Sequence, residues 1–389
     1  MSLARVDLGL RVGPGEPGPA PGLLMRALSG VEVTQGDCAP CSFRLTFSTE
    51  LVDTTTGDFA VVASELLRPF QRVLVRVSVD GVGQTLIDGF ITRQEFAPSN
   101  AQPPSSFVVS GEDVSVKMDL VDYSREFPSI TDDITVLELL APWALLGIVP
   151  DVRPTTLGLV PYDHVPQQAG TDRQTIQQLA AQNGYVFYVT PGPGLFTNVA
   201  YWGPPPRDGT PMAVLDVAVG SASSVDAVRF AYDALAPSTY FGYVMETTVD
   251  PYIPVPVLTT RSTREPALAS RPALDPAALG ELSVRRQLWR DPARDPLRAN
   301  LVAQALTDVS SDAVVTGEVS VTTARLGAVL RAPGLIAVRG AGLDYDGVYY
   351  LKRVTHAINL AAGAQWEYRQ QLTVTREGVG TTMTKLRNP

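Results

Sequence analysis

Alternation of apolar and polar residues constrains this chain more than any other feature of its sequence. Two segments, 71–81 and 366–374, keep a near-strict period of two. Successive side chains of a strand point to opposite faces, so this period predicts strands that are buried on one face and wet on the other. The apolar positions are Val73, Val75, Val77 and Val79 in the first segment and Trp366, Tyr368, Leu372 and Val374 in the second. The opposite faces carry Arg76, Ser78 and Asp80, and Glu367, Arg369, Gln371 and Thr373.

Composition agrees with many short strands joined by turns. The 389 residues are enough for two or three domains. Hydrophobic residues make up 45% of the chain and charged residues 18%, while 32 glycines and 32 prolines supply turn positions. We expect antiparallel sheets, whose closure into barrels would protect the strand edges. The alternation extends to Val114, Val116, Met118 and Leu120, which we expect on one face of a strand.

Helical spacing interrupts the strands in the middle of the chain. Ile134, Leu137, Leu140 and Leu145 recur at the period of a helix whose inner face they would form, and Pro142 would kink or divide that helix. Further helices are predicted over 171–184, with Ile176 and Leu179 inward, and over 295–313, with Leu301, Ala305 and Val309 inward.

These patterns predict a mainly β fold with an α+β insert, built from two tandem antiparallel β-barrel domains and a small α+β domain. The first β-barrel is expected over 1–127 and the insert over 128–205. The second barrel is expected over 206–250 and 310–380, interrupted by a Pro- and Arg-rich excursion and a helix over 251–309. A short C-terminal tail covers 381–389.

One pattern of three predicted strands occurs twice in the sequence. The first copy reads VRVSVDG, DGFITRQEF and FVVSGEDVS, and the second reads IAVRGAG, DGVYYLKRVTHAI and QQLTVTREG. Asp88-Gly89 matches Asp346-Gly347, each at the start of a predicted strand. Any two β-meanders share Asp-Gly turns, but the ordered agreement of three elements favours an internal duplication. Three chains with two such units each would present six near-equivalent units around an axis, able to dock a sixfold partner on one face and a threefold partner on the other.

The segments GFITRQEFAPS, FVVSGEDVSVKMD, TDRQTIQQLAAQNGYVFYV and YLKRVTHAI resemble, in their order over residues 5–380, the late control gene D proteins of bacteriophages. These are baseplate hub proteins of contractile tails and of related injection systems, and they include the hub part of type VI valine-glycine repeat spike proteins. The resemblance implies two tail-tube-like barrels in a homotrimeric symmetry adaptor that joins the sixfold inner tube to the threefold spike. It implies an inner tube protein, a spike protein and baseplate wedge components as partners.

The ends of the chain carry two further expectations. Type VI spike proteins continue into a further domain and a β-helical needle, whereas this sequence stops at Pro389, so the resemblance implies a spike on a separate polypeptide. No apolar signal core lies between Arg5 and Arg11. We expect assembly in the cytoplasm, as a component of a phage-like particle that can be released from the cell.

Charge and hydropathy argue against two other classes of partner. A net charge of −9 does not suit a general nucleic-acid binder, and no apolar run reaches the roughly 18 residues of a membrane-spanning helix. Cys38 and Cys41 form a lone C-x-x-C, for which a structural pair in a turn, a disulfide formed after release, and a redox or metal pair all stay open. A zinc site would need two more ligands, and His164 and His356 are the only histidines.

No catalytic, cofactor-binding or metal-binding residues are predicted. The adjacent Asp163 and His164 cannot easily form a triad, because the carboxylate of a triad reaches across to the imidazole ring. His356 lies in a predicted strand, which suits a structural histidine. The sequence lacks G-x-S-x-G, H-E-x-x-H and phosphate-loop motifs.

A peptidoglycan- or carbohydrate-binding or hydrolysing tail protein is the alternative function. Its candidate residues are the carboxylate pairs Asp132-Asp133 and Glu112-Asp113. Each pair also fits a helix cap or a turn. An aromatic run with Tyr185 and Phe187 would serve sugar binding, although these two alternate with Val189 as core residues do.

A structural hub would work through its surfaces. The polar faces of the strands at 71–81 and 366–374 would then face either the lumen or a neighbouring subunit. The Pro-rich segment Pro251–Leu297 would wrap around a neighbour, as extended arms do.

Overall fold

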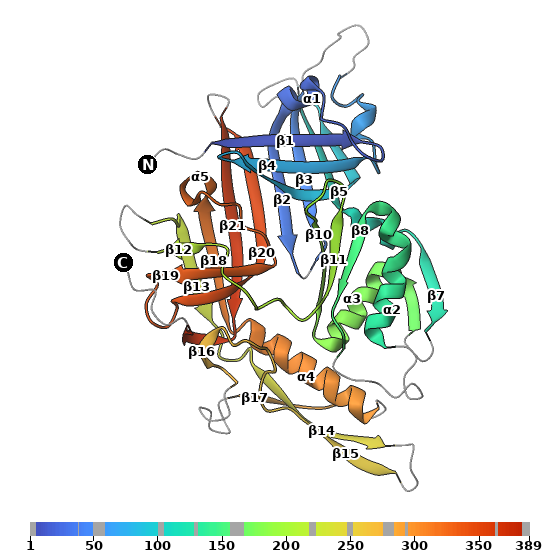
Figure 1. The fold of residues 1–389 in the computed structure, drawn as a ribbon, viewed down its shortest axis with the longest axis vertical. Coiled ribbons are helices and arrows are strands. Elements are labelled where there is room, and N and C mark those ends of the chain that lie inside the picture. The colour runs from blue at the N-terminus through green and yellow to red at the C-terminus, as the bar shows by residue number, and fades with distance from the viewer. Residues whose placement is uncertain are drawn as a thin grey trace.

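Twelve strands form one large sheet that runs through most of the molecule (Figure 1). The computed structural model describes residues 5–37, 39–49, 59–99, 105–127, 131–155, 167–217, 223–246, 252–274, 284–291, 295–361 and 365–382. Cys38, the Asp163-His164 pair and residues 383–389 lie outside them. The protein is mainly β, with a large antiparallel sheet, as the alternation predicts.

The N-terminal part of the chain supplies six strands of this sheet. They are β1 (Val6–Gly13), β2 (Leu28–Gly36), β3 (Ser42–Thr49), β4 (Arg72–Val79), β5 (Val82–Ala97) and β6 (Ser105–Asp113), with helix α1 (Gly22–Ala27) and the 3-10 turn η1 (Glu65–Leu67) between them. The four valines of β4 are buried, whereas Arg76 and Asp80 are exposed. The strand predicted over 71–81 is therefore confirmed.

The C-terminal part supplies the other six strands. They are β12 (Val214–Asp216), β13 (Ala227–Tyr232), β18 (Val315–Thr322), β19 (Gly334–Arg339), β20 (Gly347–Leu360) and β21 (Trp366–Arg376), accompanied by helix α5 (Thr323–Leu326) and strand β22 (Gly378–Thr381). In β21 Tyr368, Leu372 and Val374 are buried, while Glu367 and Arg369 are exposed. The second alternating segment is confirmed too.

The two sets of strands are laid out in the same order. In the sheet, the first set runs β4-β5-β6-β3-β2 and the second runs β19-β20-β21-β18-β13. We call these sets repeat 1 and repeat 2. In each repeat a helical turn, η1 or α5, separates the second strand of the set from the third along the chain. Agreement of five strands in chain order, spatial order and antiparallel pairing supports an internal duplication.

β-Bulges show which residues of the repeats are equivalent. The β5–β6 ladder shifts between Ile91 and Arg93, and the β20–β21 ladder shifts between Leu351 and Arg353. Aligning the bulges makes Arg93 the counterpart of Arg353. The Asp-Gly pairs are not counterparts, because Asp88 lies inside β5, three residues before Ile91, whereas residue 346 precedes β20 and lies five residues before Leu351. The sequence match therefore identified the corresponding strands, but it aligned them two residues away from the register that the bulges give.

The sheet does not close on itself among the described strands. Its path has two ends, β1 and β13, and β12 joins it as a side branch through β19. Every pair is antiparallel except β12–β19. Each repeat has its own hydrophobic core, and the core of repeat 1 also takes in Ile358 and Tyr368 of repeat 2.

One predicted strand is a helical turn. The segment Val114–Asp119 forms the 3-10 helix η2 instead of continuing β6. The carboxylate of Asp113 accepts a hydrogen bond from the Ser115 amide (2.9 Å) and caps this turn. The turn buries Val114 and Met118 in a different core, that of the insert, which explains an apolar pattern that resembles a strand.

An α+β unit, which we call the insert, follows repeat 1. It contains β7 (Asp122–Glu126), α2 (Asp132–Leu140), the 3-10 helix η3 (Ala141–Leu146), β8 (Ile148–Val152), β9 (Gln167–Thr171), α3 (Asp172–Asn183), β10 (Val186–Pro191) and β11 (Asn198–Gly203). α3 begins at a capping box formed by Thr171 and Gln174 and ends at Gly184, whose φ is +65°. Ile176 and Leu179 are buried on α3, as predicted.

The predicted inner face of α2 is only partly right. Leu140 is buried as predicted, but Ile134 and Leu137 are exposed, and Val136 and Leu139 are buried in their place. The helix ends at Leu140, two residues before Pro142, and the chain continues as a 3-10 helix, in agreement with the expected division; Leu145 in that 3-10 helix is exposed.

A projecting arm and a long helix separate β13 from β18. The arm is a three-stranded sheet of β14 (Ser238–Glu246), β15 (Ile253–Leu258) and β17 (Arg285–Leu288), and it reaches away from the body beside α4 (Pro296–Asp312) in Figure 1. The short β16 (Ala269–Pro272) pairs with β22 of its own chain. α4 buries Ala299, Ala303 and Ala305, whereas Val309, predicted to face inward, is exposed.

Candidate functional site

The two repeats join edge to edge inside the chain. β2 of repeat 1 pairs antiparallel with the C-terminal half of β20 in repeat 2, from Gly30 opposite Asn359 to Gly36 opposite Arg353. The N-terminal half of the same β20 edge pairs with β19. Val33 lies opposite His356, and both side chains are fully buried. We call this pairing the joint.

A buried polar network stabilises the joint. The Tyr368 hydroxyl lies 2.8 Å from Nδ1 of His356, and Oε1 of Gln35 lies 3.5 Å from Nε2. Gln35 also donates to the carbonyl oxygen of Leu86 (2.7 Å) and accepts from the Ala332 amide. Since these groups come from both repeats, the network fixes how one repeat sits on the other.

Burial decides the protonation state of this network. It lowers the pKa of His356 to about 3, helped by the positive charge of Arg331, so the imidazole is neutral near pH 7. It raises the pKa of Tyr368, which therefore keeps its proton and can donate it to Nδ1. Nε2–H of the neutral ring then points to Gln35. His356 is a structural histidine, which agrees with its position in a predicted strand.

A continuous polar face crosses the joint. Residues directly opposite each other in antiparallel pairs share a face, so the register can be followed from Arg93 in β5 to Arg229 in β13. Eight strands carry this face, four from each repeat: the C-terminal half of β5, then β6, β3, β2, the C-terminal half of β20, β21, β18 and β13. Its side chains include Arg93, Ser110, Arg44, Glu32, Thr34, Thr355, Gln371, Ser320, Glu318 and Arg229.

Both ends of this face are unpaired strand edges. β13 pairs with β18 along one edge, and no described strand pairs with its other edge. β4 pairs with β5 as far as Phe90, and the backbone of Phe70 and Gln71 binds Ile91. Beyond Ile91 no strand in the described part of the chain follows the outer edge of β5 to Ala97, and on this side only the Gln94 side chain donates to the Leu67 carbonyl oxygen (2.6 Å). Such edges are templates for pairing with another chain. Phe96 and Tyr232 lie on them with 39% and 46% of their surface exposed.

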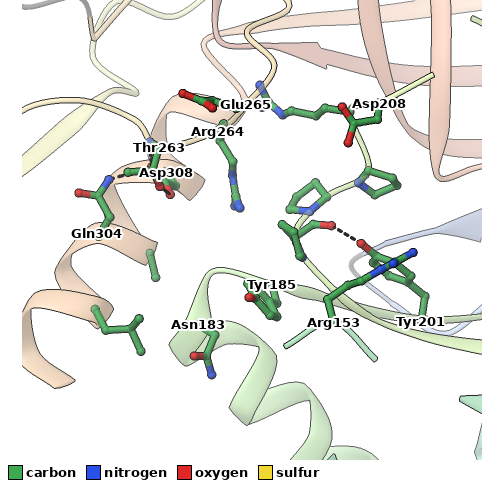
Figure 2. A pocket seen from close by; sticks show the side chains of 16 residues that line it. Arg153, Asn183, Tyr185, Tyr201, Asp208, Thr263, Arg264, Glu265, Gln304 and Asp308 are labelled. Carbon is green, nitrogen blue, oxygen red and sulfur yellow. Dashed lines mark hydrogen bonds between the residues drawn. The ribbon is translucent and has the colours of Figure 1, made fainter. Parts of the chain in front are cut away.

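The other candidate is a pocket of about 650 Å³ between the insert and α4 (Figure 2). Tyr185, Arg153 and Tyr201 lie on the insert side of the opening, and Arg264 lies across from them. The Tyr201 hydroxyl donates to the carbonyl oxygen of Pro204 (2.6 Å).

Charged groups of this pocket are used in holding the molecule together. Arg264 binds Asp312 of α4 (3.0 Å) and the carbonyl oxygen of Gly184 at the end of α3 (2.8 Å). The Asp308 carboxylate accepts hydrogen bonds from both the amide and the hydroxyl of Thr263. The pocket therefore marks where the segment before β16 ties α4 to the insert, and the Pro251–Leu297 segment binds its own chain there.

The carboxylate pairs suggested for hydrolysis also have structural partners. Asp132 is buried and forms an ion pair with Arg298 of α4 (2.9 Å), which links α2 to that helix. Glu112 pairs with Arg173 of α3 (2.8 Å). Burial raises the pKa of Asp113 to about 6, and its carboxylate accepts from the Cys41 amide (2.7 Å). The structure therefore gives each pair a role in packing the insert.

The remaining residues suggested by the sequence have structural surroundings. Cys41 is buried at the start of β3, and burial with the nearby Asp113 charge raises the pKa of its thiol, which makes it a poor nucleophile. Phe187 and Val189 are core residues of the insert. Tyr185 is half-buried and packs edge-on against Trp202, with the two ring centres 4.8 Å apart.

Sequence reasoning missed the joint and the free edges. The only local signal for β13 is the alternation of Val228 and Phe230 with Arg229. The polar residues Gln35 and Gln370 also gave no sign that they would be fully buried, because Gln370 sits where the alternation of β21 is broken.

Comparisons with known proteins show the fold. No family model matches the chain, and no curated protein matches its sequence. The chain is similar to the solved structure of the tail protein from Neisseria meningitidis MC58, with 16% identity, coverage of 97% of this chain and 98% of that one, and a TM-score of 0.59. It is also similar to the 43 kDa tail protein of prophage MuSo2 from Shewanella oneidensis, with 15% identity, coverage of 96% of this chain and 98% of that one, and a TM-score of 0.62. An E. coli component of the type VI secretion system, described as structurally similar to T4 bacteriophage tail proteins, matches at 12% identity over 93% of this chain and 77% of that one, with a TM-score of 0.52.

These likenesses extend along nearly the whole chain. The two tail proteins match both repeats, the insert and the arm as one arrangement, since 96–97% of this chain is covered. This chain therefore has the fold of phage tail proteins. Among the residues that the structure describes, no helix is both long enough and apolar enough to cross a membrane.

Proposed function

We propose that this protein is a structural subunit of a phage-like contractile injection system, a homotrimeric baseplate hub that joins a sixfold inner tube to a threefold spike. The observation that carries the proposal is the internal duplication, in which two repeats with one strand order are joined edge to edge. A trimer of such chains has six similar units, which matches a sixfold partner, while its true symmetry remains threefold.

The domain organisation is part of the same proposal. Residues 1–127 and residues 206–250 with 310–380 make up two tail-tube-like barrel domains, which complete their sheets only in the assembly. The insert of 128–205, the excursion and helix of 251–309 and the tail of 381–389 are additions to that ring. Support comes from the shared fold with two tail proteins over almost their full length.

In the ring, the polar face lines the central hole. Its opposite side is covered by the hydrophobic cores of both repeats and by the crossing strands β1, β4, β19 and β12. Because this bulk needs the larger circumference, it belongs outside and the uncovered polar face belongs inside. Mixed charges such as Arg93, Glu95 and Arg44 give the wall no strong single sign.

The proposed work is geometric and needs no catalytic residue or cofactor. The proposed partners are an inner tube protein, a spike protein and baseplate wedge components. Three structures similar to this one in fold come from a Francisella complex of PdpA with VgrG, which supports a spike protein as a partner. Assembly takes place in the cytoplasm, and the particle can be released.

Solution mass tests the proposal. The purified protein, measured by sedimentation equilibrium over a range of concentrations, should reach three times the 41.6 kDa chain mass. A protein that stays at one chain mass at every concentration, with or without co-expressed tube and spike proteins, would refute the hub.

A further inference from the structure

The joint inside the chain specifies a second joint between chains. One row of paired residues begins just before the bulge of each repeat. In repeat 1 the row runs Ile91, Gly111, Phe43 and Val33, and in repeat 2 it runs Leu351, Val374, Gly317 and Phe230. Phe230 of β13 is therefore the counterpart of Val33 of β2.

The next position of the row shows what is missing. In repeat 1, Val33 is paired with His356 of repeat 2. In repeat 2 the row ends at Phe230, on the free edge of β13. The counterpart of His356 in repeat 1 lies four residues beyond the bulged Thr92, as His356 does beyond Lys352, and it is Phe96 on the free edge of β5. Each chain thus carries both halves of a second joint, at opposite ends of its sheet.

We propose that the free edge of β13 pairs antiparallel with the outer edge of β5, from Arg93 to Ala97, in a second copy of this chain, with Phe230 opposite Phe96. The proposal rests on the proposed hub function and deepens it by naming the surfaces and the register. The two surfaces differ, so the contact is head-to-tail, and its repetition can close a ring in which neither edge is left unpaired.

The register brings complementary side chains together. Antiparallel pairing that sets Phe230 opposite Phe96 also sets Asp233 opposite Arg93, in the positions of Gly36 and Arg353 at the internal joint. Opposite charges in a directly facing pair stabilise a sheet, and aromatic pairs do so as well. Arg229 comes diagonally beside the acidic residue at position 95, within reach of a long side chain.

The two joints differ in polarity in a way that fits assembly. The internal joint is closed by a buried polar network around His356, Gln35 and Gln370. In the second joint, Phe96 stands at the position that corresponds to His356, Tyr232 at that of Gln35 and Phe107 at that of Gln370. Phe96 already packs edge-on against Phe59, with ring centres 4.9 Å apart, and against the buried Phe107, with ring centres 6.4 Å apart. It still exposes 39% of its surface, and a partly exposed aromatic ring of this kind gains from being covered by a partner.

Cysteine pairs test the register directly. Ala231 and Glu95 would face each other across the joint, and directly opposed residues of antiparallel strands lie about 4.5–5.5 Å apart at Cα, within disulfide range. The double variant Ala231→Cys with Glu95→Cys, oxidised with diamide, should give covalent dimers and trimers on non-reducing gels. The matched control is Ala231→Cys with Ser110→Cys, because position 110 lies one strand further inside and about 4.8 Å farther away. Each single-cysteine variant shows how much the native cysteines cross-link.

A charge exchange supplies an independent readout. Arg93→Asp alone and Asp233→Arg alone should each weaken association by about tenfold per joint, and combining them should restore it. Asp233 also accepts a hydrogen bond from the Leu235 amide (2.8 Å), so Asp233→Asn, which can keep that bond, isolates the effect of charge. Unchanged thermal unfolding shows that the variants still fold, since the Arg93 side chain is 71% exposed.

The outcomes separate this inference from the hub itself. Trimers that cross-link equally in the control pair, or that ignore the charge exchange, would overturn the proposed joint and leave a hub held by other surfaces. A protein that remains monomeric would overturn both.

Discussion

Acidification should weaken this protein through one histidine. Burial holds the pKa of His356 at about 3 in the folded chain, against the ordinary value of 6.5 expected on unfolding. Since the folded pKa is depressed, the unfolded chain binds the extra proton between these values. The stabilisation is complete above pH 6.5 and is lost as pH falls towards 3.

The size of the effect follows from that gap. Between pH 7 and pH 4.5, proton uptake by this histidine in the unfolded chain removes about 2–3 kcal/mol of the free energy of unfolding. The variant His356→Gln has no proton to bind at this position. Its stability deficit relative to the native chain, measured by urea denaturation, should therefore shrink by about 2–3 kcal/mol over this range.

The only other histidine provides a matched control. His164→Gln should leave the pH dependence unaltered if His356 alone is responsible. Equal slopes of stability against pH for the native chain and for His356→Gln would refute the reasoning, because they would show that the imidazole is not held neutral at the joint. Carboxylates titrate in the same range, and the comparison of variants subtracts their contribution.

Two substitutions test packing elsewhere. Gly111→Ala should lower the free energy of unfolding, measured by urea denaturation, by about 3 kcal/mol or more, because the new Cβ would lie 2.0 Å from the carbonyl oxygen of Phe90. In the control Gly18→Ala the new Cβ meets nothing within 4 Å, and the change should stay within about 0.5 kcal/mol. Similar losses for both variants would contradict the β5–β6 pairing. Arg298→Met should lower the free energy of unfolding by about 3–5 kcal/mol, because it leaves the buried Asp132 without its cation. Adding Asp132→Leu should recover most of the lost stability. A double variant no more stable than Arg298→Met would show that the ion pair is not the cause.

Alternation predicted the sheet strands well, because a strand that is buried on one face shows alternating apolar and polar residues within its own segment of sequence. The valines of β4 and the apolar residues of β21 needed no knowledge of their neighbours. The same local signal failed at Val114 and Val116, where burial comes from the insert and a capping carboxylate at Asp113 turns the backbone into a 3-10 helix. Helical spacing, the other local signal, misplaced part of the inner face of α2, where Ile134 is exposed and Val136 is buried.

The candidate site was harder to predict because it is defined by pairing between distant strands. The duplicated pattern was visible in the sequence, and the structure supports it through strand order. The match of Asp88 with Asp346 was out of register, because the β-bulges that fix the register cannot be recognised from the amino-acid composition or from the alternation of apolar residues. The joint at His356 and the free edge at Phe230 emerge only once both repeats are placed in one sheet.

End-on electron microscopy of the purified protein tests the central claim most directly, namely that the two repeats are equivalent parts of one ring. We predict threefold averages with six similar lobes at one radius around a central hole. A single-chain particle, or a trimer in which the two repeats lie at different radii, would contradict it.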